Sequence, residues 1–435
     1  ALAAPRAMAK TYEVGMDASF IKFGDAVEAI NQSGDAENEI VLMENITLDG
    51  NYILTNSKKT TIKTTTIKGE GNTITVNPGA GITVAGEKTV LNLGANGYDG
   101  TLTIDGKTSG GFVSVLEGAT ANMYENVTLQ NRKSTGNACI VIMGSKSVFN
   151  MRGGVTENCS RAAIADSGAT FHMFDGEIKD CKVKGDGVIL VNDESKFIMD
   201  GGTISGCEAD AGGGLYVDNS TVTINNGTIS ECTAVIKEGG GLYATNGSTI
   251  NINSGTISKC TADNGGGLYA DNSTVTISGG TISGCKGVWG GGLYAENSST
   301  IEISGGTISG CTAGAGGGLY VVGSTLNIKG GTISECFVSD TGKGGGLFAD
   351  QSTLTISGGT IKGNKAAYGG GVALRDSRVK EEEPITNWTV VDNKAYKTKT
   401  GTGYVGGGIY LENGSMNASA GSNKIYNNTA DGHGA

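Results

Sequence analysis

Residues 265–289 read GGGLYADNSTVTISGGTISGCKGVW, and close variants of this segment recur before and after it. A cysteine accompanies each copy, and these cysteines follow one another at intervals of 22 to 28 residues. Self-similarity at such a period is typical of a solenoid, in which each repeat forms one coil and contacts only its neighbours. The repeated cysteines are Cys159, Cys181, Cys207, Cys232, Cys260, Cys285, Cys311 and Cys336.

Each copy contains three short segments with strand character, Gly-Leu-Tyr-Ala, Ser-Thr-Val-Thr-Ile and Gly-Thr-Ile-Ser. They are rich in β-branched residues and are separated by turns of Gly, Asn and Ser. If the coils stack in register, every strand gains a parallel neighbour about 4.8 Å away, and the backbone groups pair between coils. The sequence therefore predicts an all-β fold, a right-handed single-stranded parallel β-helix with three strands and about 25 residues per coil.

Two apolar columns support this register. Because side chains alternate along a strand, inward Val222 and Ile224 place Thr221 and Thr223 outside. The first column consists of Met123, Met151, Met173, Met199, Ile224, Ile252, Ile277, Ile303, Ile328 and Ile356. The second consists of Ile204, Ile229, Ile257, Ile282, Ile308, Ile333 and Ile361. We expect both columns to lie in the interior.

Composition limits the partners of the chain. The formal net charge of −11 argues against nucleic acid and anionic membranes as partners. No apolar run approaches the roughly 18 residues that a membrane-spanning helix needs, so we expect no membrane insertion by this stretch. Residues 1–10, ALAAPRAMAK, are interpreted as a signal-peptide remnant or a disordered end.

The remaining chain divides into a cap and a solenoid. Phe20, Phe23, Val27 and Ile30 have helical spacing, so residues 11–38 are expected to form an N-terminal cap with a short helix over 17–31. Such a cap covers the open edge of the first coil. Residues 39–435 are expected to form the β-helix, with an enlarged coil near 372–405, and the pattern at the end suggests that further coils follow residue 435.

The cysteine column continues as asparagine at Asn364, Asn393 and Asn428. An inward Asn can form an amide ladder, whereas Cys in the same place packs as a small buried apolar residue. We interpret the column as a structural ladder of thiols, although neighbouring coils are close enough for some disulfides. Cys139 lies outside the column, and with nine cysteines at least one stays unpaired in any pairing. Spacing of one residue per coil carries no signal for a metal site.

No catalytic motif is evident. The chain has only two histidines, His172 and His433, which leaves little basis for a Ser-His-Asp or Cys-His system. The carboxylate column Asp218, Asp271, Glu296 and Asp350 sits in turns that favour such residues. Two irregular groups are the remaining candidates for a local site: Asp180, Lys182, Lys184 and Asp186, and Arg375, Asp376 and Arg378. We predict a non-enzymatic protein without a cofactor, and a polysaccharide lyase or glycoside hydrolase of the pectate-lyase-like β-helix type is the alternative.

An aromatic column is the candidate binding site. It consists of Tyr216, Tyr243, Tyr269, Tyr294, Tyr320 and Phe348. If the preceding Leu points inward, these rings point outward and form a row that can stack on sugar rings or hold a protein surface. The other interpretation is that the rings stack on one another and shield the Gly-rich bend. In the binding interpretation, changing Tyr269, Tyr294 and Tyr320 together to Ala weakens binding and leaves the fold intact.

The GGGLY and GGTISG motifs with a following Cys or Asn resemble repeats of adhesin-like surface proteins from bacteria and methanogens. They are also similar to the repeats of chlamydial polymorphic outer-membrane proteins. The resemblance covers roughly residues 120–430 and implies a secreted, extracellular cell-surface protein that acts as an adhesin or structural stalk. Its implied partner is a glycan or protein on a host or neighbouring cell. The resemblance provides no catalytic residues.

Overall fold

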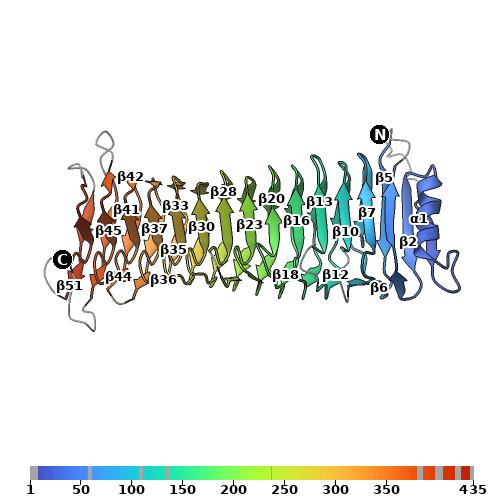
Figure 1. Cartoon of the computed structure of the whole chain (residues 1–435), viewed down its shortest axis with the longest axis horizontal. Coiled ribbons are helices and arrows are strands. Elements are labelled where there is room, and N and C mark those ends of the chain that lie inside the picture. The colour runs from blue at the N-terminus through green and yellow to red at the C-terminus, as the bar shows by residue number, and fades with distance from the viewer. Residues whose placement is uncertain are drawn as a thin grey trace. The chain divides into compact units, whose positions relative to one another are not determined.

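The structure is a computed structural model that describes residues 8–56, 61–106, 111–133, 138–236, 238–339, 341–379, 386–396, 405–416 and 423–431. The chain forms two compact units. Unit 1 comprises Ala1–Lys184 and Val188–Thr203, and unit 2 comprises Gly185–Gly187 and Ile204–Ala435. Both units consist of parallel strands stacked coil upon coil, so the parallel β-helix predicted from the sequence is confirmed (Figure 1).

In unit 1, successive coils contribute one strand each to three parallel sheets, named A, B and C. Sheet A contains β1 (Lys10–Val14), β2 (Glu37–Leu42), β5 (Lys63–Lys68), β8 (Thr89–Leu93), β11 (Thr120–Met123), β14 (Val148–Met151), β17 (Thr170–Met173) and β20 (Lys196–Met199). Sheet B contains β3 (Ile46–Leu48), β6 (Thr73–Val76), β9 (Leu102–Asp105), β12 (Val127–Gln130), β15 (Val155–Glu157) and β18 (Glu177–Lys179). Sheet C contains β4 (Asn51–Thr55), β7 (Gly81–Ala85), β10 (Val113–Leu116), β13 (Ile140–Met143), β16 (Ala163–Asp166) and β19 (Ile189–Val191).

Unit 2 repeats this arrangement with more regular strands. Sheet A contains β24 (Thr221–Ile224), β28 (Thr249–Ile252), β31 (Thr274–Ile277), β34 (Thr300–Ile303), β38 (Thr325–Ile328), β42 (Thr353–Ile356) and β46 (Arg378–Val379). Sheet B contains the last two residues of β21 (Thr203–Ser205), then β25 (Thr228–Ser230), β29 (Thr256–Ser258), β32 (Thr281–Ser283), β35 (Thr307–Ser309), β39 (Thr332–Ser334), β43 (Thr360–Lys362), β47 (Thr389–Val391) and β50 (Lys424–Tyr426). Sheet C contains β23 (Leu215–Asp218), β27 (Leu242–Thr245), β30 (Leu268–Asp271), β33 (Leu293–Glu296), β37 (Leu319–Val322), β41 (Leu347–Asp350), β45 (Val372–Arg375) and β49 (Ile409–Glu412).

Some coils of unit 2 carry a fourth, two-residue strand that the three-strand prediction did not include. It lies in the bend that follows the cysteine column. The short strands are β22 (Glu208–Ala209), β26 (Thr233–Ala234), β36 (Thr312–Ala313), β40 (Phe337–Val338), β44 (Lys365–Ala366), β48 (Lys394–Ala395) and β51 (Thr429–Ala430). In each of these strands except β51, the second residue is a buried apolar side chain, as Val338 is, and it closes the core at that corner.

The two apolar columns are buried, as predicted. Register pairs Met151 with Met173, and Met173 with Met199. In unit 2, Ile282 pairs with both Ile257 and Ile308, and the flanking Thr281 lies outward. Because each interior side chain rests on the same residue type above and below, the core is filled by stacking identical layers.

The Gly triplets have a steric cause. Gly265 has a φ of +61°, which glycine adopts more readily than other residues. At Gly266, a Cβ atom would lie 2.2 Å from the Lys286 carbonyl oxygen of the next coil. A side chain at that position would push the two coils apart, so the bend can stack at strand spacing only with glycine there.

The N-terminal segment contains a helix, α1 (Phe23–Gln32), that begins later than the predicted 17–31. Its buried face packs beside β1 and β4, with the Phe23 and Tyr52 ring centroids 5.5 Å apart. Asn31 holds the helix to β4, because its Nδ2 donates to the Ile53 carbonyl at 2.7 Å. The expected cap also contains β1, which pairs in register with β2 and belongs to sheet A.

The strand register changes near the end of unit 2. Val372 pairs with Ile409, 37 residues later, and Thr389 pairs with Lys424, 35 residues later, whereas Leu347 pairs with Val372 only 25 residues later. Extra residues therefore lie between Val372 and Ile409. Much of the predicted insertion, 380–385 and 397–404, lies outside the described residues, as do residues 1–7 of the expected remnant and His433.

Candidate functional site

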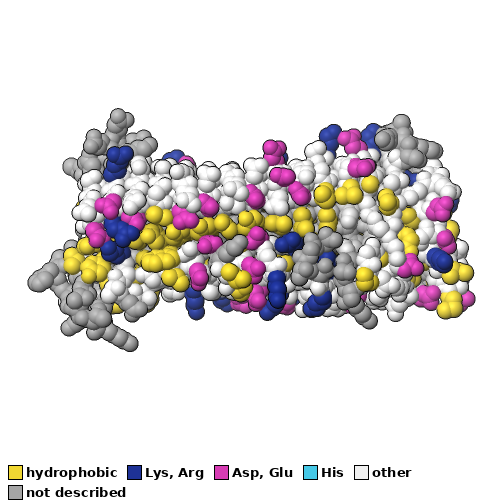
Figure 2. Space-filling view, in the orientation of Figure 1, with side chains coloured by type: hydrophobic (Ala, Val, Ile, Leu, Met, Phe, Trp, Pro, Cys, Tyr) yellow, Lys and Arg dark blue, Asp and Glu magenta, His cyan; other side chains and the backbone are white. Residues whose placement is uncertain are grey.

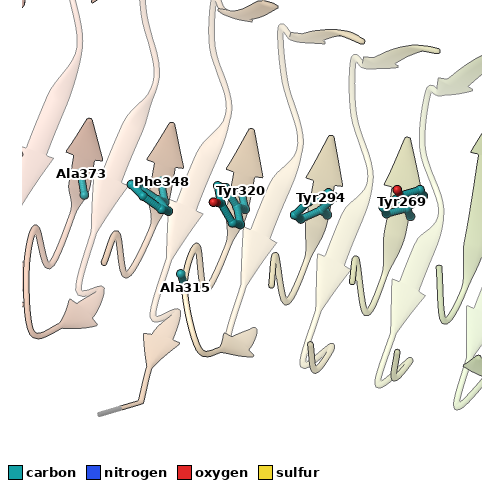
Figure 3. Close-up of a cluster of buried hydrophobic side chains, with 6 residues drawn as sticks. All are labelled: Tyr269, Tyr294, Ala315, Tyr320, Phe348 and Ala373. Atoms are coloured by element: carbon teal, nitrogen blue, oxygen red, sulfur yellow. The ribbon is translucent and has the colours of Figure 1, made fainter. Parts of the chain in front are cut away.

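Hydrophobic side chains form a band over the sheet C strands of unit 2 (Figure 2). The band contains the aromatic column, which comprises the second residue of each sheet C strand from β23 to β41. Neighbouring ring centroids in the column lie 4.7 to 5.3 Å apart. Figure 3 shows Tyr269, Tyr294, Tyr320 and Phe348 side by side, one from each successive coil.

The rings cover one another instead of forming an open row. Tyr269 is 4% exposed, Tyr294 is 8% exposed and Phe348 is 2% exposed, while Tyr216 and Tyr243 are half-buried. Tyr294 meets Tyr320 edge-on at 5.1 Å, whereas Tyr269 and Tyr294 are nearly parallel. These contacts favour the stacking interpretation, and they correct the expectation of a row of exposed rings along the whole column.

The ring hydroxyls are also engaged at the centre of the column. Tyr294 Oη donates to Glu296 Oε2 at 3.0 Å, and Tyr269 Oη contacts the other oxygen of the same carboxylate. Burial raises the pKa of Tyr216 to about 12, and it also raises the pKa of Tyr294. The column is therefore a desolvated, uncharged ridge at neutral pH.

A groove opens beside one part of the column, next to Tyr320 and Phe348. Trp289 forms one wall, is 44% exposed, and lies 5.8 Å from Tyr320 between ring centroids. The backbone of Trp289 is held by hydrogen bonds to Asp263 and Gly265, so the bend projects the indole. The groove has a volume of about 340 Å³. Its lining consists of Trp289, Gly314, Ala315, Tyr320, Ser339, Thr341, Gly342, Lys343, Phe348 and Arg375.

Two cations line the groove, and each contacts a carboxylate. Arg375 Nε donates to Asp350 Oδ1 at 2.9 Å, and its guanidinium lies 5.5 Å from the centroid of Phe348. The hydrogen bond with Asp350 raises the pKa of Arg375. Lys343 Nζ contacts Glu412, and it also lies 6.0 Å from the centroid of Tyr410. Because both cations are held by carboxylates, their remaining donors have defined directions.

A second, wider groove continues from the first and shares Gly314 and Ser339 with it. Its volume is about 640 Å³, and exposed Val288 and Phe337 lie in its lining. The bends that follow Cys285, Cys311 and Cys336 form both grooves. We name this surface, comprising residues 286–289, 312–315, 337–339 and 341–343 together with Tyr320, Phe348 and Arg375, the bend surface.

The carboxylates of the column Asp218, Asp271, Glu296 and Asp350 accept hydrogen bonds from turn residues, from tyrosine hydroxyls and from Arg375. Asp218 accepts a hydrogen bond from Asn246 at 2.7 Å, and Asp271 accepts one from Asn297 at 2.7 Å. Glu296 binds the tyrosine hydroxyls and Asp350 binds Arg375, as given above. Each member has a structural contact in its own coil or the adjacent one.

Most members of the two irregular charged groups lie at the surface, and Arg375 lines the groove described above. Asp180, Lys182 and Lys184 are exposed, and Asp186 is half-buried. Asp376 is exposed with a φ of +47°, which marks a turn. In the second group, Arg375 lines the groove, whereas Asp376 and Arg378 lie on the surface.

His172 has a carboxylate partner. Its Nε2 lies 2.7 Å from Asp200 Oδ2, and its ring stacks on Phe174 with centroids 3.7 Å apart. Asn150 precedes it in the same register, and Asn150 donates to Asn122 at 2.9 Å. This polar row lies on the outer side of sheet A in unit 1.

The cysteine column and the asparagine column share one position. In the coil of Cys336, Sγ lies 3.3 Å from the Ser334 carbonyl and 4.0 Å from the Ile308 carbonyl. In the next coil, Asn364 Nδ2 donates to the equivalent Ile333 carbonyl at 3.1 Å and to Asn393 Oδ1 at 3.0 Å. The amide ladder expected from the sequence is therefore present, and the cysteines of the column are buried.

Sequence reasoning missed a ladder of buried serines in the turn between sheets C and A. The backbone N–H of Ser273 donates to Ser299 Oγ at 3.0 Å, and that of Ser299 donates to Ser324 Oγ at 3.1 Å. Ser352 and Ser377 continue the pattern. A signal was available, since Ser recurs directly before the first Thr of each copy. The pairings of Lys343 and Arg375 were also missed.

Among the residues that the structure describes, no group of three or more His, Cys, Asp or Glu side chains is placed to hold a metal ion. Over the same ranges, no helix has both the length and the hydropathy to cross a bilayer.

The model of the right-handed β-helix region matches residues 172–329 and 266–435. The chain belongs to this β-helix family. No curated protein matches the sequence. A solved structure, the A-module of mannuronan C-5 epimerase AlgE6 from Azotobacter vinelandii, is similar at 12% identity over 93% of this chain and 92% of that chain. The TM-score between the two structures is 0.30.

Proposed function

We propose that this β-helix is a non-catalytic, extracellular cell-surface protein, an adhesin or projecting stalk, whose bend surface binds an extended glycan. The observation that carries the proposal is the exposed Trp289 facing a groove whose wall is the rigid end of the aromatic column. The indole lies beside the apolar side chains of the groove, and its flat apolar face suits a sugar ring.

The groove combines the two kinds of contact that a glycan needs. Trp289, Tyr320 and Phe348 provide apolar faces, while Ser339 and Thr341 provide hydroxyl groups at the rim. Lys343 and Arg375 add donors that are already oriented by Glu412 and Asp350. Sites with mostly apolar walls and a few oriented polar groups are typical of ligand binding.

The second groove favours an extended ligand over a single sugar. It adjoins the first through Gly314 and Ser339, and exposed Phe337 offers another ring. A polymer that crosses both grooves gains several weak contacts in one rigid arrangement, and these contacts add to give avidity. The resemblance of the repeats to those of surface adhesins supports an extracellular setting.

A glycan array with the full chain tests the proposal. Wild-type protein should bind a set of extended glycans, and Trp289→Ala should lower their affinity by about tenfold or more, because a central aromatic contact is lost. The matched control is Tyr426→Ala, which removes another exposed ring, 49% exposed, from sheet B.

Three outcomes would contradict the proposal. The first is the absence of any glycan ligand, with binding to a surface protein instead. The second is equal loss of binding in Trp289→Ala and Tyr426→Ala. The third is release of shorter saccharides from a bound polysaccharide, which would identify a lyase or hydrolase.

A further inference from the structure

In unit 1, one cysteine of the column, Cys159, meets a cysteine outside the column, Cys139. Cys139 lies directly before β13, and Cys159 lies two residues after β15. Both are buried, and their Sγ atoms are 2.6 Å apart, well inside the van der Waals contact distance of two sulfur atoms. Two thiols are not stable at this separation, so the pair needs an explanation that the other cysteines do not.

The repeat itself explains why these two positions meet. In unit 2, the residue directly before each sheet C strand is the third glycine of the triplet, for example Gly267 before β30. A Cβ atom built there would lie 3.3 Å from Cys285 Sγ, and at Gly241 it would lie 3.3 Å from Cys260 Sγ. Cys139 holds the position of that third glycine, and Cys159 holds the position of the facing cysteine.

This geometry is close to that of a disulfide. With an S–S bond of about 2.05 Å, the Cβ of one cysteine lies about 3 Å from the sulfur of the other. The values of 3.3 to 3.5 Å at Gly214, Gly241, Gly267, Gly292 and Gly318 show that the β-helix presents nearly this separation in coil after coil. In those coils the residue that faces the cysteine is glycine, which has no side chain, so no disulfide can form there. We propose that Cys139 and Cys159 form a disulfide that links two adjacent coils of unit 1.

A buried arginine, Arg132, interacts with this pair of cysteines. It lies two residues after β12, as Cys159 lies two residues after β15, so it occupies the column position in the preceding coil. The side chain is fully buried, and its charge acts on both Cys139 and Cys159. The contacts with Cys139 and Cys181, and then the charge of Arg132, lower the pKa of Cys159, whereas burial raises the pKa of Cys139.

The oxidant is a low-molecular-weight disulfide, and the reaction is thiol–disulfide exchange. The thiolate of one of the two cysteines attacks one sulfur of the oxidant, forms a mixed disulfide and releases one thiol. The other cysteine then loses its proton and attacks the protein sulfur of the mixed disulfide, which forms the Cys139–Cys159 disulfide and releases the second thiol. The oxidant is reduced to two thiols and the two cysteines are oxidised. Because both sulfurs are buried in the folded coils, exchange takes place as these coils close during folding.

Peptide mapping without reduction tests the proposal on the full chain, produced with export to an oxidising compartment and alkylated in denaturant. Trypsin should yield residues 134–146 joined to residues 153–161. Reduction before alkylation should separate this pair and add two alkylated cysteines per chain. Finding the two peptides separately, each with an alkylated cysteine, would overturn the proposal. Linkage of Cys159 to Cys181 would overturn it equally.

Two variants make the result specific. Cys139→Ala should remove the linked pair, so that reduction no longer changes the number of alkylated cysteines. It should still fold, because register places Ala162 and Val188 at the same position in the next two coils. Cys285→Ala is the matched control in unit 2, and it should leave the gain of two on reduction unchanged. A gain that persists in Cys139→Ala would refute the assignment.

Discussion

Asn364 Oδ1 accepts a hydrogen bond at 2.9 Å from the backbone N–H of Cys336, the residue that precedes it in the column. The two side chains occupy the same corner of successive coils, and both face the carbonyl of an interior isoleucine. The corner accepts either a thiol that makes weak contacts or an amide that makes several strong ones. This difference leads to the first prediction.

Replacing Cys336 with Asn should extend the amide ladder by one coil. The new Nδ2 would donate to the Ile308 carbonyl, which Cys336 Sγ now faces at 4.0 Å. Each added hydrogen bond contributes about 1 kcal/mol, so the free energy of unfolding should stay level or rise. Denaturant titration checks this. A loss above about 2 kcal/mol would mean that the cysteine corner is too narrow for an amide.

The interior isoleucines should contribute more to stability than the column cysteines. Ile282 is buried between Ile257 and Ile308, so Ile282→Ala should lower the free energy of unfolding by about 2 to 5 kcal/mol. Cys285→Ser should lower it by about 1 to 3 kcal/mol, because a hydroxyl replaces a thiol at a buried site. Equal losses in the two variants, measured by denaturant titration, would contradict this order.

The three-stranded coil and the residues that face its interior could be predicted from the sequence alone. A period of two along each strand and the repeat of each position once per coil determine which residues face inward, as Met151 and Ile282 illustrate. The same logic located the shared Cys and Asn corner. These features depend only on backbone geometry.

The site could be predicted only in part. Strand alternation places Tyr294 on the outer side, but it does not determine whether the ring lies open or packs against its neighbours. The contact of Lys343 with Glu412 joins residues 69 positions apart across the enlarged coil, where the repeat period breaks. Trp289 projects from a bend whose conformation depends on the neighbouring coils. Side-chain packing, and not the period, decides these features.

The buried rings lead to a third prediction. Tyr294 contacts Tyr269 and Tyr320, so Tyr294→Ala should lower the free energy of unfolding by about 3 kcal/mol. Changing Tyr269, Tyr294 and Tyr320 together should disturb the fold, contrary to the expectation from the sequence. Circular dichroism and thermal unfolding would check this. Unaltered melting of the triple variant would show that the rings contribute little to the fold.

The tyrosine column should also limit stability at high pH. Burial holds the pKa of Tyr216 at about 12, above the value of about 10 in an unfolded chain. A raised pKa favours the neutral phenol in the folded state, so this contribution is complete below pH 10 and is lost as the pH rises from about 10 to 12. Tyrosinate absorbance and circular dichroism, recorded in one titration, check this. Ionisation of all tyrosines near pH 10 with the fold intact would contradict the burial of the column.

The central claim is that a glycan covers Trp289, and the fluorescence of this residue tests it most directly. The chain has two tryptophans, and the other, Trp388, is 1% exposed, so an accessible indole signal comes from Trp289. Titration with a glycan that the protein binds should shift the emission to shorter wavelength and protect it from acrylamide quenching. Trp289→Tyr should remove both changes. A glycan that binds tightly while the emission and quenching of Trp289 stay unchanged would contradict the account.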